Sequence, residues 1–167
     1  MIDPSWVQMM SRYNQWQNQN LYSAADTLSD DDRRTDRGAF FKSIHGTLSH
    51  ILWADRVWLA RFRGQPVNFG TIAQSPEMIG DWGTLKAERT KMDQDIQEWA
   101  SLIESADLCG ELVFYSVSMD KEVRSERGLC VVHMFNHQTH HRGQAHALLT
   151  ASGVTPSATD LPLMPAD

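Results

Sequence analysis

The chain has 167 residues, of which 41% are hydrophobic and 22% are charged, with a formal net charge of −6. These values are typical of one soluble globular domain, which we expect to span residues 1–167. The acidic balance argues against nucleic-acid binding, and no apolar run approaches the roughly 18 residues of a membrane span. No signal peptide is recognisable, and two cysteines fit a reducing, cytoplasmic setting. We expect Cys109 and Cys130 to be semi-buried apolar side chains.

Two long helices are expected in the first half of the chain. The first is predicted from about residue 5 to residue 28, after Pro4, because apolar residues recur there at helical spacing. Residues 29–38 form a polar break. The second helix is predicted over about 39–63 and ends at Gly64, a residue type that commonly terminates helices.

The second half starts with a long connection over residues 64–80. A third helix is predicted over about 81–105, because its apolar residues keep the 3-4 spacing of a bundle helix. Residues 111–127 alternate between apolar and polar side chains, which predicts a small β-hairpin with a turn at Ser118-Met-Asp. A fourth helix is predicted over about 128–152, and the proline-containing tail after it is expected to be non-helical.

Four long helices predict an all-α fold, a four-helix bundle, with the hairpin between the third and fourth helices. The connections before the third and fourth helices are long. They therefore permit crossover connections instead of a simple up-down-up-down order.

The histidines are concentrated in one short stretch. Five of the seven fall within residues 133–146. His137 and His141 are four residues apart, so they share one helical face and can converge on one metal ion. His50 is the best third ligand, because it lies near the middle of the second predicted helix while the pair brackets the middle of the fourth.

Three neutral imidazoles leave the charge of a divalent ion uncompensated. Such an ion lowers the pKa of a bound water to about 7 in favourable cases, or holds an anionic ligand such as a thiolate. Three histidines with an open position are typical of catalytic zinc sites, whereas structural sites carry a fourth protein ligand. Zinc or nickel ranks first, and iron, copper or manganese is also compatible.

The remaining histidines are ambiguous or peripheral. His133 precedes His137 by four residues, so it is either a ligand in place of His141 or a base near the site. His45, His140 and His146 are expected to be bystanders or to support the ligands. Solvent-exposed histidine clusters without metal also occur, so the spacing alone leaves that alternative open.

Three further residues stand out beside the histidines. Arg89 occupies an apolar position of the third helix, so its head either reaches water or points into a central pocket, where it would steady an anion. Gln144 follows His141 by one turn and could hold a ligand histidine or the bound water. Gly143 is costly in a helix, which suggests a close approach by a neighbouring helix or the site.

The sequence resembles the DinB-like superfamily over nearly its whole length. The motifs that carry the resemblance are Tyr13-Asn-x-Trp16, the block Ser43-Ile-His-Gly-Thr-Leu-Ser-His50 continuing to Trp58, and the block His137-Gln-Thr-His-His141-Arg-Gly-Gln144. The resemblance implies an up-down-down-up four-helix bundle, usually dimeric, with a divalent metal held by three histidines. The matching positions are His50, His137 and His141.

Two functional hypotheses follow. The first is an enzyme whose metal activates a low-molecular-weight thiol or water against a small-molecule substrate, with His133, Arg89 and Gln144 as assisting residues. Relatives that use low-molecular-weight thiols in transfer and isomerisation reactions imply such a thiol as a cofactor. The second is a non-catalytic metal-binding or small-ligand-binding protein of the stress response.

Overall fold

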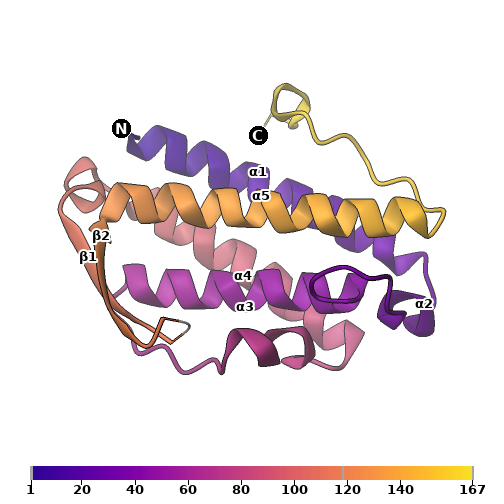
Figure 1. Ribbon diagram of the computed structural model, residues 1–167. Helices are drawn as coiled ribbons and strands as arrows, with labels where there is room; N and C mark the ends of the chain where they lie inside the picture. The colour runs from indigo at the N-terminus through magenta and orange to yellow at the C-terminus, as the bar shows by residue number, and fades with distance from the viewer. Residues whose placement is uncertain (1, 118, 167) are drawn as a thin grey trace.

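The computed structural model describes residues 2–117 and 119–166. The chain is mostly helical, and its four long helices are α1 (Pro4–Asp26), α3 (Ile44–Phe62), α4 (Trp82–Leu102) and α5 (Arg127–Ala151) (Figure 1). The short elements are α2 (Asp30–Arg34), the 3-10 turns η1 (Ile72–Glu77), η2 (Ser105–Leu108) and η3 (Leu161–Leu163), and the strands β1 (Glu111–Ser116) and β2 (Lys121–Glu126). The prediction of four long helices is confirmed.

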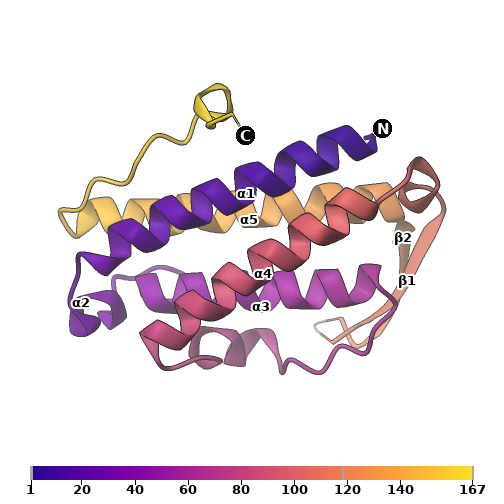
Figure 2. The same cartoon turned by 180° about the vertical axis from the view of Figure 1, so that it is seen from behind.

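Each long helix packs against two of the others. Both α1 and α3 contact α4 and α5. Figures 1 and 2 show that α1 and α5 run in one direction while α3 and α4 run in the opposite direction. Long connections make this order possible, because the segment between α3 and α4 returns along the side of α3 through η1.

The predicted hairpin is confirmed. β1 and β2 pair antiparallel with a register that runs from Glu111 opposite Glu126 to Ser116 opposite Lys121. The hairpin lies between α4 and α5 and crosses one end of the helices (Figure 1). Its turn was expected at residues 118–120, and Ser118 lies outside the described residues.

The second long helix begins later than the sequence predicts. Residues 39–42 form a tight turn instead of a first helical turn, with Lys42 at φ 65°. Ser43 then caps the helix, since its Oγ accepts a hydrogen bond from the Gly46 N–H at 3.0 Å. His50 consequently lies in the second turn of α3 and not near the helix midpoint.

The polar break contains a short helix that the sequence analysis missed. Ser29 caps α2, three aspartates occupy its first turn and two arginines its last, an order that complements the helix dipole. At the other end of the chain, the tail is irregular as expected, except for the 3-10 turn η3. No helix in the described part of the chain is long and apolar enough to cross a bilayer.

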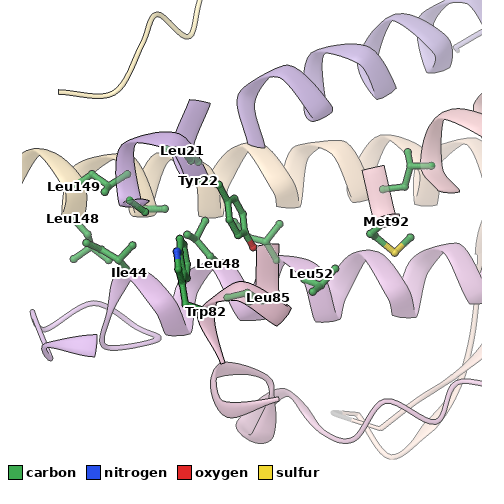
Figure 3. Close-up of a cluster of buried hydrophobic side chains, with 14 of the residues drawn as sticks. Leu21, Tyr22, Ile44, Leu48, Leu52, Trp82, Leu85, Met92, Leu148 and Leu149 are labelled. Atoms are coloured by element: carbon green, nitrogen blue, oxygen red, sulfur yellow. The ribbon is translucent and has the colours of Figure 1, made fainter. Parts of the chain in front are cut away.

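The buried hydrophobic residues form two clusters. One cluster joins all four long helices, with Leu21, Leu48, Leu85 and Leu149 as central members (Figure 3). In this cluster the rings of Tyr22 and Trp82 stack with centroids 5.3 Å apart. A second cluster includes Phe135 and Leu112 of the hairpin. Its other members include Val7, Phe62, Ala100, Ile103, Val131 and Met134.

Leu85 provides a test of this packing. Its side chain is fully buried in α4, so we expect Leu85→Ala to lower the free energy of unfolding by about 2–5 kcal/mol. Leu102, at the end of the same helix, is 79% exposed, so Leu102→Ala should change it by about 0.5 kcal/mol or less. Urea denaturation of both variants checks the difference, and equal losses would contradict the described core.

Candidate metal centre

Three histidines from two helices converge. His50 comes from α3, and His137 and His141 come from successive turns of α5. One ring nitrogen from each lies within 4.8 Å of the others, so the group could hold a metal ion. His50 Nε2 and His137 Nε2 are 3.3 Å apart. Two nitrogens bound to one tetrahedral zinc at about 2.0–2.1 Å lie about 3.3 Å apart, so this pair already has the required separation.

The tautomer of His50 is determined by Ser75 in η1. The hydroxyl of Ser75 donates to the Ile72 carbonyl at 2.7 Å, so its oxygen is free to accept from His50 Nδ1 at 2.8 Å. The proton of His50 therefore resides on Nδ1, and the lone pair of Nε2 points toward His137. Such a hydrogen bond orients a metal-ligating imidazole and raises its basicity.

Gln144 does the same for His141. Its Oε1 atom accepts a hydrogen bond from His141 Nδ1 at 2.7 Å, while its Nε2 atom lies 3.3 Å from His140 Nε2. An amide oxygen can only accept, so the proton of His141 is also on Nδ1 and its Nε2 atom is free. The geometry thus favours the predicted contact of Gln144 with a histidine of the group, whereas its role in catalysis stays a prediction.

An aromatic wall closes one side of the site. The ring of Phe41 stacks on His50 with centroids 3.8 Å apart, and Trp53 packs on the same imidazole at 5.6 Å. Phe41 lies in the tight turn before α3. The turn packs directly against Gly46 of α3. A Cβ at this position would lie 2.4 Å from the Phe41 carbonyl oxygen, so only glycine allows the turn to come this close. Sequence reasoning assigned Phe41 to the helix and missed this contact.

Burial keeps the three imidazoles uncharged. It lowers the pKa of His50 and of His137 to about 3, with further lowering by the neighbouring histidines. The pKa of His141 is also lowered by burial, although its hydrogen bond with Gln144 acts in the opposite direction. Metal ligands must be deprotonated, so these residues are in the binding form at neutral pH.

His133 lies beside the converging group and is not part of it. Its ring centroid is 5.8 Å from that of His137, and its ring meets Trp58 edge-on at 5.0 Å. His133 is solvent-exposed. The structure therefore joins His141, and not His133, to His50 and His137, and it leaves His133 in a position from which it could exchange protons with solvent.

Arg89 is buried in an ion network. Its guanidinium lies 2.6 Å from an Asp55 carboxylate oxygen and 2.9 Å from one of Asp93, and all three side chains are at most 3% exposed. The guanidinium does not reach water, so the first of the two alternatives for Arg89 is wrong. Both carboxylates hold it inside the helices, so steadying a substrate anion remains a prediction without a contact to support it.

This network extends to the other two long helices. Gln138 Nε2 in α5 donates to Asp55 at 2.7 Å, and Asn18 Nδ2 in α1 donates to Asp93 at 2.8 Å. Gln138 directly follows His137, so the network adjoins the metal centre. Apolar periodicity does not reveal these partners of Arg89, although the spacing of Arg89 and Asp93, one helical turn apart, is a signal for a buried pair.

Other expectations have mixed outcomes. A Cβ at Gly143 would meet nothing within 4 Å, so the predicted close approach is wrong. Cys130 is buried, but Cys109 is exposed, which contradicts the expectation for Cys109. His45 is buried with its Nε2 atom 2.7 Å from the Ile79 carbonyl, away from the converging group.

The role of Ser75 is testable through metal affinity. Ser75→Ala removes the acceptor of the His50 Nδ1 proton, so we expect zinc to bind about 10–100-fold more weakly. Ser101→Ala, at an exposed site that bonds only its own helix, should leave the affinity unchanged. Competition with a chromophoric chelator measures both constants, and identical affinities would remove Ser75 from the site.

The lowered histidine pKa values predict the pH dependence of stability without metal. Below pH 6.5 the unfolded chain protonates His50 and His137 while the folded chain does not, so stability falls as the pH decreases toward 3. Burial raises the pKa of Asp93 to about 6, which acts in the opposite direction below that pH. We expect a net loss of roughly 1 kcal/mol per pH unit.

Denaturation in the presence of a chelator at pH 7 and pH 5 measures this loss. His137→Gln should show a shallower dependence, because one of the histidines whose pKa is lowered by burial is removed. A free energy of unfolding that rises as the pH is lowered would contradict the lowered pKa values of His50 and His137.

Two comparisons with known proteins address the family of the chain. No curated protein gives a significant match to the chain. A sequence model described as the DinB family matches residues 1–166, which is nearly the entire chain and includes every histidine of the converging group. The chain therefore belongs to the DinB family.

Proposed function

We propose that this protein is a metal-dependent enzyme that activates a small thiol or water, as a thiol S-transferase or a hydrolase. The observation that carries the proposal is the convergence of His50, His137 and His141 with their Nε2 or Nδ1 atoms within 4.8 Å. The donors fit a divalent ion of borderline character, and zinc or nickel suits them best. A bound ion would supply Lewis acidity, which lowers the pKa of a thiol or water at the open position.

The composition of the group favours catalysis over a purely structural ion. Within residues 2–117 and 119–166, it contains three histidines and no cysteine or carboxylate. Cys130 is buried in the hydrophobic cluster around Phe135, and Cys109 is exposed near η2. A structural zinc site would be closed by a fourth protein ligand, whereas three ligands leave a position for a reactant.

The protein's own residues would orient the metal ligands and transfer a proton. Ser75 and Gln144 hold the protons of His50 and His141 on Nδ1, which keeps both Nε2 atoms available. Phe41 and Trp53 shield one side of His50 from water. His133 is exposed one turn before His137, and we assign it the transfer of a proton between the reactant and solvent.

Further features of the proposal concern the whole protein. We propose that the four long helices form an up-down-down-up bundle and that two chains assemble into a homodimer. We also propose a cytoplasmic location and a small-molecule substrate, with no nucleic acid or membrane as partner. The helix directions and pairings support the bundle.

Metal analysis and an activity screen test the proposal. The purified chain should contain about one divalent ion per protomer, as a three-histidine site implies. His50→Ala and His141→Ala should lose it, while His146→Ala, at a position outside the converging group, should retain it. Retention of the metal by the first two variants would eliminate the site.

The screen pairs low-molecular-weight thiols and water with electrophiles, with and without a chelator. We expect turnover that chelation abolishes and that added metal restores. A metal-loaded protein without turnover across the panel would favour the non-catalytic binder, and turnover that is indifferent to chelation would contradict the metal mechanism.

A further inference from the structure

A pocket lies between α1, α5 and the C-terminal tail, which returns past both helices (Figures 1 and 2). Its volume is about 280 Å³. Two hydrogen bonds hold the tail over it, from Tyr13 Oη to the Thr159 carbonyl at 2.6 Å and from Gln17 Nε2 to the Ala158 carbonyl at 3.1 Å. The tail is therefore fixed beside the pocket, and its residue Thr159 contributes to the lining.

The pocket contains a buried cation without a carboxylate partner. Arg142 lines the pocket and is only 5% exposed. Its guanidinium donates to Asn14 Oδ1 and to Thr139 Oγ1, which are uncharged acceptors. In the described part of the chain no carboxylate forms an ion pair with it, because the nearby Asp55 and Asp93 both pair with Arg89.

A buried charge with only neutral partners is energetically costly. A guanidinium stays charged at neutral pH, so Arg142 carries its positive charge inside the protein. A guanidinium has five N–H donors, and the two hydrogen bonds described use two of them. An anion that enters the pocket would satisfy further donors and compensate the charge.

The other pocket residues define the remainder of the ligand. Leu21 and the ring of Tyr13 form an apolar wall, and His146 has a buried Nδ1 atom without a partner. At Gly143 a Cβ would meet nothing within 4 Å, so the helix surface is open there. The volume of about 280 Å³ is slightly below the roughly 300 Å³ at which ligand sites usually start, so only a small molecule fits.

We propose that this pocket binds a small monocarboxylate with a short apolar or aromatic body. The planar guanidinium of Arg142 matches the two oxygens of a carboxylate, and Leu21 and Tyr13 would pack against the body. The pocket offers one buried fixed positive charge, so a phosphate dianion would bring a second negative charge that nothing compensates.

This site is separate from the metal centre. His141 points toward α3, where its ring lies 4.7 Å from that of His50, whereas its neighbour Arg142 bonds Asn14 of α1. The proposal is therefore tested on the full chain in its metal-loaded form, by binding instead of turnover.

Benzoate and butyrate are the probes, with inorganic phosphate for comparison. Because Arg142 is buried and its variants risk misfolding, the main variant is Gly143→Phe. Gly143 lines the pocket, and an added Cβ there meets no heavy atom within 4 Å, so the ring can occupy the pocket. The matched control is Ala147→Phe, one turn along α5 at an exposed position that does not line the pocket.

We expect benzoate to bind saturably to the native chain and to Ala147→Phe. Calorimetry measures the affinity, and ¹H–¹⁵N NMR shifts of residues around Arg142 locate the bound molecule. Gly143→Phe should bind at least tenfold more weakly. Absence of saturable binding to the native chain, or equal binding by Gly143→Phe, overturns the site. Phosphate binding as tight as benzoate binding overturns the assignment to carboxylates.

Discussion

The buried ion network around Arg89 is the constraint on which the arrangement of the helices depends. Removing one partner from a buried, paired charge costs about 3–5 kcal/mol, so the network is stable only when every member is in place. Arg89 of α4 must reach Asp55 of α3, Asn18 of α1 must reach Asp93, and Gln138 of α5 must reach Asp55. Hydrophobic side chains tolerate some sliding between helices, whereas these directional contacts do not.

The same register aligns the metal centre. Gln138 directly follows His137, and Asp55 lies five residues after His50 on α3. The alignment that lets Gln138 bond Asp55 at 2.7 Å is therefore the one that brings His50 Nε2 to 3.3 Å from His137 Nε2. A site built on two rigid helices needs such a fixed register, because a shift of 1 Å between ligands changes metal geometry appreciably.

The parts of the fold that follow local rules could be predicted from the sequence. Apolar periodicity located the four long helices, and alternation located the hairpin. The start of α3 was misplaced because Phe40 and Phe41 continue the apolar pattern, while the turn depends on the positive φ of Lys42 and on a glycine at position 46. The contact of Ser75 with His50 joins residues 25 positions apart, and no periodicity encodes it.

The sequence by itself determined that His137 and His141 share a face, because residues four apart on a helix are neighbours. It also singled out His50 as their partner and Arg89 as an anomaly in an apolar seam. Only the tertiary structure decided that the three imidazoles converge, which nitrogen of His50 and His141 carries the proton, and that Arg89 faces two carboxylates. The physical reason is one of range: helical spacing fixes neighbours within a turn, whereas contacts between helices depend on a register that the whole core and its buried charges set together.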